Sequence, residues 1–489
     1  QHLPKLLNME LHLKAYSDKI TRVSVNGKPA AWRVDTAVVG TPAIWVMCGK
    51  YQENSIEIEW GGKVVKTPEE IAVARGESYM QTIGALVDKI YDPQLVLKNK
   101  NIEEDIISGT IKGEVGHRTF FVRATQGDLT WWMPVGLWVK EPLEVQPVNP
   151  GSGHLSFCLR NNRVVAVTGK LLVNGEQIKD KQTIAAGSVS EKIEISDGIA
   201  VFGTNRISFV QDNGQREDLT LVDWTLPVNA KERTEVVNMD NQLNDKVTKI
   251  FKNEYLAPRS PYTTLQTPTQ GIGEWTHPLT TASIDDSGLR KASANDVFNT
   301  PMGVPFRTAS LPETKNIAFT SLWNNYPASV TVPLTGKASH AYLLMAGSTN
   351  HMQSRFTNGV VKVWYTDGTS DSLSLVNPQT WCPIEQDYYE DGFAFNMHAP
   401  RPYRVFLKTG AVSREMMATK EKQPTDTSKR NGGDYTETPV SPASGREIDG
   451  GAAVILDLPL NRSKQLKQLT LETRANEVVI GLMGVTLMR

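Results

Sequence analysis

The segment QGIGEWTHPLTTASIDDSGLR, from Gln270 to Arg290, combines glycines with several side chains that can transfer a proton. Glycoside hydrolases use two carboxyl groups, one as general acid and the other as base or nucleophile. The candidate catalytic residues are therefore Glu274, Asp285 and Asp286. The alternative is an irregular segment between domains, held by hydrogen bonds from its own polar side chains.

A polar stretch, residues 348–355, follows the apolar run from Ala341 to Met345 and precedes an alternating region that turns at Asp367-Gly368. Amide and guanidinium groups form planar hydrogen bonds with hydroxyl-rich ligands. The predicted carbohydrate-binding residues of this stretch are Asn350, His351, Gln353 and Arg355. The alternative is a polar turn in which Arg355 pairs with a carboxylate.

Aromatic side chains cluster in SLWNNYP (321–327), NPQTWCPIEQDYYEDGFAF (377–395) and PRPYR (400–404). Flat aromatic faces stack on the apolar C–H faces of sugars, although aromatic residues near proline also fill cores. The candidates for sugar stacking are Trp323, Tyr326, Trp381 and Tyr388. A separate aromatic group, Trp131, Trp132 and Trp138 with Asp128, lines a cleft or fills a sheet core.

Acidic residues gather in one short segment that could hold a cation. Oxygen-rich loops bind Ca²⁺, but the spacing here is not that of an EF-hand. The candidate ligands of a structural Ca²⁺ are Glu385, Asp387 and Asp391, and the alternative is a solvated acidic turn. The three cysteines and eight histidines are scattered without metal-ligand spacing, so no other cofactor is predicted.

Composition excludes several classes of function. The 489 residues include 52 Lys and Arg against 53 Asp and Glu, a net charge of −1 that offers no basic surface to nucleic acid or an anionic membrane. No apolar run reaches the roughly 18 residues of a transmembrane helix. The sequence begins at Gln1 instead of Met, which predicts a processed form or a fragment.

Alternating short apolar segments predict a mainly β protein with several β-sandwich or jelly-roll domains in tandem and a few short helices. The expected domains are a β-rich domain (1–148), an immunoglobulin-like sandwich (154–227), a helical and irregular connector (228–305) and a jelly-roll-like sandwich (306–489) with a mobile loop (419–451). Expected helices begin at the capping sequence Thr67-Pro68-Glu69-Glu70, within 80–90 and within 243–251.

Three strings resemble the carboxy-terminal region of large exported bacterial glycan-degrading proteins, the multidomain glycosidases of the α-L-rhamnosidase kind. They are YLAPRSPYTTLQTPTQGIGEWTHP, SLWNNYPASVTVPLTGKASHAYLLMAGSTNHMQSRFTNGVVKVWYTDG and NPQTWCPIEQDY. In that family, β-sandwich modules accompany a catalytic helical toroid. The present sequence lacks the dozen amphipathic helices of a toroid, so no catalytic residue is carried over.

The resemblance implies a β-sandwich region of a carbohydrate-active protein that is exported to the periplasm or cell surface of a bacterium. Its expected partners are a plant or other complex polysaccharide or oligosaccharide and a catalytic domain located upstream or on a separate chain. Two alternatives remain open: a complete glycoside hydrolase that uses the loop carboxylates, and a non-catalytic scaffold or adhesion protein.

Overall fold

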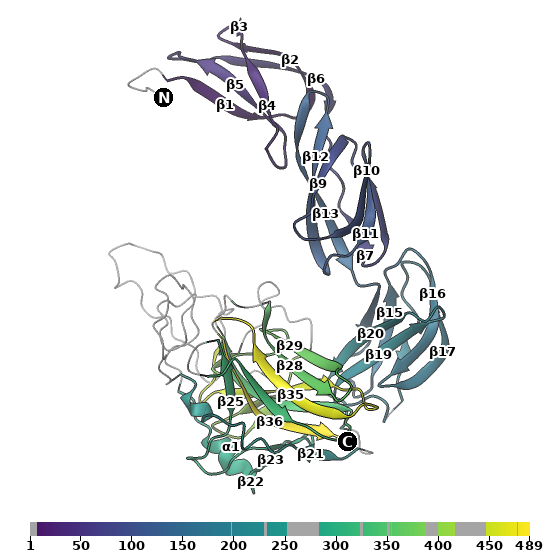
Figure 1. Ribbon diagram of the computed structural model, residues 1–489, viewed down its shortest axis with the longest axis vertical. Helices are drawn as coiled ribbons and strands as arrows, with labels where there is room; N and C mark the ends of the chain where they lie inside the picture. The colour runs from purple at the N-terminus through teal and green to yellow at the C-terminus, as the bar shows by residue number, and fades with distance from the viewer. Residues whose placement is uncertain are drawn as a thin grey trace.

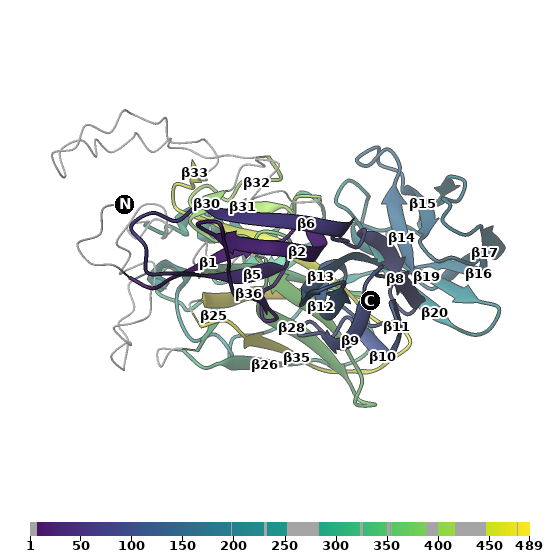
Figure 2. The same cartoon turned by 90° about the horizontal axis from the view of Figure 1, so that it is seen from above.

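The computed structural model describes residues 7–196, 198–228, 232–251, 283–322, 326–349, 353, 355–387, 400–415, 446–476 and 478–489. These residues form four β-sandwiches that follow one another along the chain (Figure 1). The first three make an arm that curves away from the larger C-terminal sandwich, so that the whole has the shape of a hook with a concave side (Figures 1 and 2). The prediction of a mainly β protein with several sheets in tandem is confirmed.

The first sandwich contains two small antiparallel sheets. Asn26 and Gly27 connect β2 to β3 with φ angles of 49° and 74°, the left-handed pair that a two-residue hairpin turn requires. One sheet has the order β1 (Met9–Lys14), β5 (Ala43–Gly49), β4 (Trp32–Asp35), and the other β3 (Lys28–Pro29), β2 (Ser17–Val25), β6 (Ile56–Val64).

The second sandwich packs a sheet of long strands against a sheet of shorter ones. The long sheet has the order β7 (Ile71–Ala74), β13 (Leu129–Lys140), β12 (Gly116–Gln126), β9 (Leu86–Tyr91). The shorter one has the order β10 (Leu97–Glu103), β11 (Ile106–Ile111), β8 (Ser78–Thr82). One hydrophobic cluster runs through both sandwiches, so most of the predicted domain 1–148 forms two sandwiches with a continuous core.

Two predicted helices of this region are strands, which corrects the sequence-based assignment. Residues 67–70 precede β7, which pairs in parallel with Leu137–Lys140. Ile71 and Val73 pack against the core, and β-branched side chains suit such an alternating strand better than a helix. Residues 80–90 contribute to β8 and β9.

The third sandwich begins earlier than predicted. Its first strand is β14, so residues 149–153 lie in a turn within the sandwich instead of a linker before it. One sheet has the order β14 (Leu143–Pro147), β15 (Ser156–Asn161), β18 (Ile193–Glu194). The other has the order β17 (Glu176–Ile184), β16 (Val167–Val173), β19 (Gly203–Gln211), β20 (Arg216–Asp223).

The C-terminal sandwich has a large sheet that is covered on both faces. Its order is β21 (Thr234–Val236), β36 (Val478–Met488), β27 (His340–Thr349), β34 (Ala452–Pro459), β31 (Arg404–Phe406), β32 (Val412–Ser413), with β25 (Ala318–Ser321) also paired to β36. The facing sheet has the order β26 (Ser329–Pro333), β35 (Leu466–Thr473), β28 (Thr357–Tyr365), β29 (Ser370–Val376). Every residue of β27 and β36 is buried, as expected for strands that carry continuous apolar runs.

Small elements cover the outer face of the large sheet. They are η1 (Val247–Lys249), α1 (Ser287–Ala292), β22 (Ser293–Ala294), β23 (Val297–Asn299) and β24 (Pro305–Arg307); β30 (Gln386–Asp387) pairs with β33 (Arg446–Glu447). The helix expected within 243–251 is only the single 3₁₀ turn η1, because Asn316 Oδ1 accepts the backbone N–H of Val247 and fixes the segment against the sheet. The described parts of the predicted connector 228–305 therefore belong to this sandwich.

Hydrogen bonds between sandwiches support the hook. At the first junction the Asp18 carbonyl accepts the Asp128 N–H at 2.7 Å, and Asp128 Oδ2 accepts the N–H of Ile20. At the last junction Asp457 Oδ2 accepts the Thr204 N–H at 2.6 Å, and Tyr342 donates its hydroxyl to the carbonyl of Phe202 at 2.8 Å. Both junctions use buried or partly buried groups, which restrict rotation between neighbouring sandwiches.

Candidate functional site

The polar stretch after β27 turns inward in its described part. Ser348 and Gln353 are 2% and 4% exposed. Ser348 Oγ donates to Glu385 Oε1 at 2.8 Å, and the Gln353 carbonyl accepts the side-chain amide of Asn358 at 2.8 Å. The side chain of Gln353 is thus enclosed in the sandwich and is not presented to a ligand as the carbohydrate-binding prediction requires.

Trp381 lies in the core of the C-terminal sandwich and is 1% exposed. Its indole Nε1 donates to Asn358 Oδ1 at 3.1 Å. The ring packs against Gly347, where an added Cβ would lie 2.8 Å from it. Trp381 is therefore a core residue with no ring face open to a sugar, which corrects the stacking prediction for this residue.

Glu385 is a buried carboxyl group, not part of a solvated acidic loop. It is 0% exposed, and burial raises its pKa to about 7 against the hydrogen bond from Ser348, which lowers it. Among the described residues no group of three potential metal ligands lies together. The burial of Glu385 does not fit the alternative of a solvated acidic turn, and the Ca²⁺ site stays a prediction, because Asp391 and the side chain of Asp387 lie outside the described part.

Two other predicted binding residues have identifiable local roles. Tyr326 donates its hydroxyl to Asp245 Oδ2 at 2.8 Å, and its ring packs 5.0 Å from that of Phe319. Arg355 is exposed, has a φ of 65° and donates its backbone N–H to the Asn377 carbonyl at 2.7 Å. The remaining predicted sugar contacts lie outside the described residues; they are Trp323, Asn350, His351 and Tyr388.

The predicted catalytic carboxylates that are described do not form an acid–base pair around a shared space. Asp286 is 7% exposed; its Oδ2 accepts from Arg290 Nε at 2.8 Å and from Asn316 Nδ2 at 2.7 Å. Asp285 Oδ1 accepts the backbone N–H of Ser287 at 2.9 Å, and hydrogen bonds from Ser287 lower the pKa of Asp285. These contacts are structural, and Glu274 lies outside the described residues.

The second sandwich carries a row of aromatic side chains on its outer surface, which we call the aromatic face. Along β13 the residues at 131, 133, 135, 137 and 139 are at most 1% exposed and fill the core. The alternate residues therefore point outward, and the strand pairing places their neighbours from β12 and β9 on the same face. The aromatic face consists of Tyr91, His117, Phe121, Trp132 and Trp138.

The rings of the aromatic face form two groups. Tyr91 lies 6.3 Å from Phe121 and 6.5 Å from Trp132, measured between ring centroids. Trp138 and His117 lie 5.1 Å apart, and Trp138 is 47% exposed while Tyr91 is 59% exposed. Because the two tryptophans are six residues apart on one strand, their α-carbons are separated by about 20 Å.

Polar side chains flank both groups of rings. Arg123 Nε donates to Asp88 Oδ1 at 2.7 Å, and its Nη2 contacts the other oxygen; this pairing lowers the pKa of Asp88. Glu70 Oε1 lies 3.0 Å from His117 Nε2. Glycine at position 136 leaves room for the contact between Glu70 and His117, since a Cβ there would lie 2.6 Å from Glu70 Oε1.

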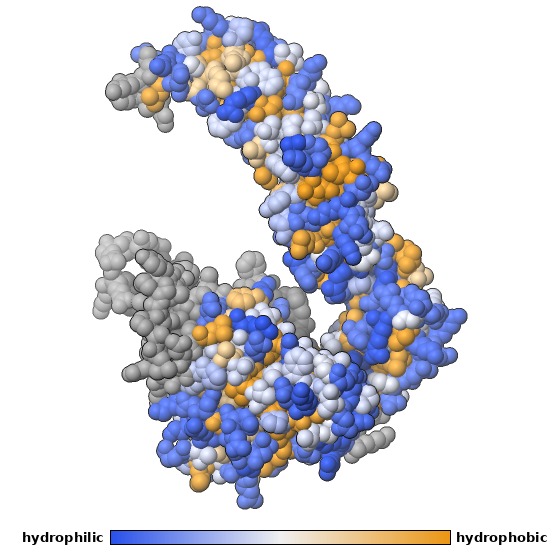
Figure 3. Space-filling model, in the orientation of Figure 1, coloured by the Kyte–Doolittle hydropathy of each residue, from blue (hydrophilic) through white to orange (hydrophobic). Residues whose placement is uncertain are grey.

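The aromatic face is on the concave side of the hook. In Figure 1 β9, β12 and β13 lie toward the open side of the hook, and β10 and β11 lie on the side away from it. The surface of the arm is largely hydrophilic, with apolar areas on the second and third sandwiches (Figure 3). A ligand on the aromatic face would thus lie inside the hook.

Only two residues of the aromatic face were among the candidates predicted from the sequence. Trp132 and Trp138 belong to the aromatic group noted above, whereas Trp131 is 0% exposed and Asp128 holds the junction with the first sandwich. Tyr91, Phe121 and His117 were missed because they come from other strands. The signal that separates Trp132 and Trp138 from Trp131 is the alternation along β13.

No family model and no curated protein matches the sequence. Among solved structures, the chain aligns with a Bacteroides ovatus protein from a mixed-linkage glucan utilization locus, SGBP-B, in complex with a mixed-linkage heptasaccharide. That alignment has 7% identity and a TM-score of 0.18, and covers 95% of this chain and 92% of the other.

Two further alignments involve fibronectin(III)-like modules of Clostridium thermocellum CbhA and an endo-fucoidan hydrolase of glycoside hydrolase family 107. The first has 16% identity, a TM-score of 0.12 and coverage of 33% and 90% of the two chains. The second has 12% identity, a TM-score of 0.12 and coverage of 47% and 43%. TM-scores this low establish no shared arrangement, so function has to be argued from the residues of this chain.

Proposed function

We propose that the protein is a glycan-binding protein whose tandem sandwiches present a carbohydrate-binding surface, and that the aromatic face of the second sandwich is that surface. The observation that carries the proposal is the outward row of aromatic rings on β9, β12 and β13. Exposed aromatic surface on a folded domain marks an interaction site more often than scattered apolar residues do.

The ligand is a glycan because the surface alternates flat rings with hydrogen-bonding groups. The rings of Trp138 and Tyr91 offer apolar faces to the C–H side of a sugar ring. The ion pair of Arg123 with Asp88 offers both donors and acceptors to hydroxyl groups beside them. A fully apolar partner would leave these charges desolvated without compensation, so it fits the surface less well.

We further propose that the protein is located outside the cytoplasm of a bacterium and that it holds a glycan-cleaving domain in place. Both points follow from the resemblance of its C-terminal sequence to exported bacterial glycan-degrading proteins. The arm supports this role physically, because its junctions hold the aromatic face in a defined position relative to the C-terminal sandwich. The described residues include no helix of the length and apolarity that a membrane crossing requires.

The test measures retention of the full chain in native gels that contain neutral polysaccharides, followed by calorimetry with oligosaccharides of the retaining polymer. Trp138→Ala and Tyr91→Ala are each expected to weaken binding about tenfold or more, as removal of a central aromatic contact does in other interfaces. The matched control is Trp60→Ala on the first sandwich, where Trp60 is 36% exposed.

Unchanged retention of Trp138→Ala and Tyr91→Ala proteins would refute the assignment of the aromatic face. If no polysaccharide retains the wild-type protein while its circular dichroism shows an intact β fold, the scaffold alternative replaces glycan binding. Conversion of the oligosaccharide to shorter products by the purified chain would support the complete-hydrolase alternative.

A further inference from the structure

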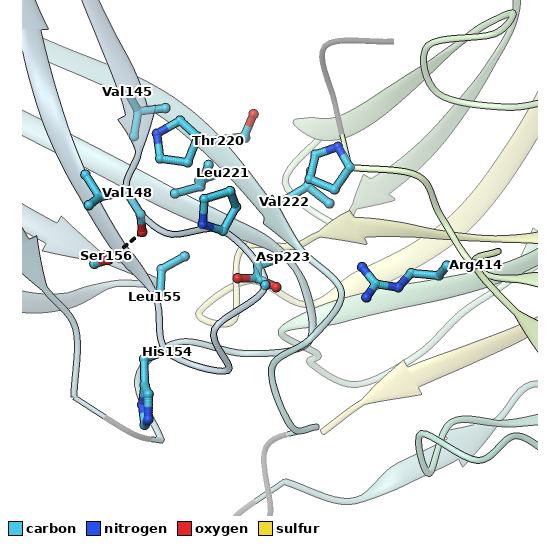
Figure 4. Close-up of a pocket in the computed structure, with 14 residues that line it drawn as sticks. Val145, Val148, His154, Leu155, Ser156, Thr220, Leu221, Val222, Asp223 and Arg414 are labelled. Atoms are coloured by element: carbon cyan, nitrogen blue, oxygen red, sulfur yellow. Dashed lines mark hydrogen bonds between the residues drawn. The ribbon is translucent and has the colours of Figure 1, made fainter. Parts of the chain in front are cut away.

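A cavity of about 620 Å³ lies between the third sandwich and the C-terminal sandwich (Figure 4). Cavities of this size commonly hold small ligands, and junctions between domains are a frequent place for them. It is separate from the aromatic face, since it is lined by residues of β14, β15, the turn between them and β20, together with Pro400 and Arg414, and none comes from the second sandwich.

The wall on the third sandwich is mainly apolar. Val145, Leu155 and Leu221 contribute aliphatic surface, and Pro147 adds a rigid ring. Ser156 lies in the same wall and donates its hydroxyl hydrogen to the Val148 carbonyl at 2.7 Å, drawn as a dashed line in Figure 4. This wall can therefore pack against the C–H face of a small ring, while the hydroxyl oxygen of Ser156 can still accept a hydrogen bond.

Asp223 places a carboxylate in this wall at the end of β20. It is 7% exposed, and its Oδ1 accepts both the N–H and the hydroxyl of Thr225, at 2.8 and 2.6 Å. These two bonds fix the orientation of the carboxylate, and Oδ2 keeps its capacity to accept from a ligand hydroxyl.

Arg414 comes from the C-terminal sandwich and points into the cavity from the side opposite Asp223 (Figure 4). Its guanidinium lies over the ring of Tyr403, 5.3 Å from the centroid. Tyr403 in turn packs 5.9 Å from Phe202 and 6.5 Å from Trp224, so the platform beneath Arg414 is built from both sandwiches.

Among the described residues, the guanidinium of Arg414 has no carboxylate partner. Within the described part of the chain, no Asp or Glu oxygen lies at ion-pair distance from its guanidinium, in contrast to Arg206, which lines another interdomain cavity and pairs with Asp371 at 3.0 Å. A half-buried guanidinium held by an aromatic platform is preorganised for a planar oxyanion, which it binds through two parallel hydrogen bonds.

We propose that this cavity binds an acidic saccharide, a sugar that carries a carboxylate or sulfate group. Arg414 binds the acidic group, Asp223 accepts hydroxyl hydrogens, and the wall around Leu155 and Leu221 packs against the sugar ring. The choice of a saccharide over other small acids rests on the proposed glycan-binding function; the acidic group rests on Arg414 alone. The aromatic face and the cavity are then two sites with different ligand preferences on one chain.

The test is calorimetry on the full chain with three monosaccharides: galacturonate, galactose 6-sulfate and galactose. At least one acid is expected to bind more tightly than galactose, by about tenfold to a hundredfold, the effect of charge-assisted hydrogen bonds. Comparison of the two acids identifies which group the cavity prefers. Binding of the acid should weaken as NaCl is raised.

Arg414→Gln is expected to reduce affinity for the acid to that for galactose, whereas Arg414→Lys retains the charge but loses the planar fork and should fall between. The matched control is Arg22→Gln, since Arg22 lies on the exposed first sandwich and is paired with Glu59. Asp223→Asn provides a second variant that weakens binding of the acid and of galactose alike.

Three results would each overturn the inference. They are equal affinity for galactose and both acids, failure of both acids to bind at about millimolar concentration, and an Arg414→Gln protein that binds the acid with full affinity. The outcome is distinguishable from that of the proposed function. Loss of acid binding with intact Trp138-dependent polysaccharide retention refutes only the cavity, whereas Arg414-dependent acid binding without any polysaccharide retention refutes the proposed function and leaves the cavity in place.

Discussion

Trp138 in the second sandwich and Trp381 in the C-terminal sandwich have the same side chain in opposite environments. Trp138 is 47% exposed beside His117 on an outer sheet face, whereas Trp381 is 1% exposed among the core residues of its sandwich. The indole N–H of Trp381 is donated to Asn358 within the protein. The ring of Trp138 is therefore available to a ligand, and that of Trp381 serves packing.

The surroundings of the two tryptophans differ in the same way. Around Trp381 the polar groups of Ser348, Gln353 and Glu385 are buried and contact other protein groups. Around Trp138 the polar groups remain at the surface; an example is the pair formed by His117 and Glu70. Amide, acidic and aromatic residues thus mark a binding surface in one region and a polar core in the other, and only the direction of the side chains distinguishes them.

The largest effect is expected from Trp381→Ala. Removing a fully buried indole leaves a cavity and an unpaired Asn358 oxygen, and should lower the free energy of unfolding by about 3–5 kcal/mol. Urea denaturation followed by circular dichroism measures the change, with Trp381→Phe as a milder control that retains most of the ring. A loss below about 1 kcal/mol would show that Trp381 is not a core residue.

Asp286→Asn tests whether a predicted catalytic carboxylate is structural. The variant leaves the buried Arg290 without its counter-charge and should cost about 3 kcal/mol, the lower end for a broken buried pair because Asn still accepts a hydrogen bond. Asp285→Asn is the control, since Asp285 is only partly buried. A stable Asp286→Asn protein that had lost glycan turnover would instead restore Asp286 to the catalytic hypothesis.

The strands of the fold were predictable because their signals are local. Alternation and the Asn26-Gly27 turn predict β2 and a hairpin after it, but the predicted return strand with Trp32 and Val34 is β4, which pairs with β5 in the other sheet, and β2 pairs with the short β3 instead. The false helix at 67–70 also followed local signals, a capping sequence before Ile71 and Val73. Residues 71–74 form a strand instead because β7 pairs in parallel with residues 137–140 of β13. A pattern within a short stretch of sequence cannot indicate a contact with residues so far away.

The candidate sites were only partly predictable for the same reason. Alternation around Trp132 and Trp138 indicates which tryptophans point outward, but Tyr91 joins them through pairing of β9 with β12. Arg414 was not singled out by sequence, because its significance depends on Asp223, which lies nearly two hundred residues earlier and on another sandwich. The burial of Glu385 likewise results from the packing of two sheets.

Glu385→Gln tests the buried carboxyl through pH. The folded-state pKa is about 7 against 4.5 for the free group, so the folded protein holds this proton up to higher pH. The stability associated with the protonated group is fully present below pH 4.5 and is lost as pH rises through 7. Gln mimics the protonated form, so the variant should be more stable than wild type at pH 8 by about 3 kcal/mol, at 1.36 kcal/mol per pKa unit.

The comparison of wild type and Glu385→Gln has to be made at both ends of the range, because other buried groups titrate too. Burial lowers the pKa of His340 to about 4 and raises that of Asp457, and both contribute equally to the two proteins. The difference in unfolding free energy between Glu385→Gln and wild type is therefore measured at pH 8 and at pH 4.5. The change in that difference between the two pH values isolates the contribution of Glu385. A difference that does not change with pH would mean that Glu385 is solvated.

The smallest effect on stability is expected from Trp138→Ala, which completes the comparison with Trp381. Because Trp138 is half-exposed, its removal costs only the cross-strand contact with His117 and part of its packing, under about 1 kcal/mol. The same denaturation experiment measures this change, and glycan binding is measured on the same sample. A small loss in unfolding free energy together with loss of glycan binding identifies Trp138 as a ligand contact. A loss of several kcal/mol would instead place Trp138 among the core residues, as with Trp381. That result would remove the physical basis for a binding surface on the second sandwich.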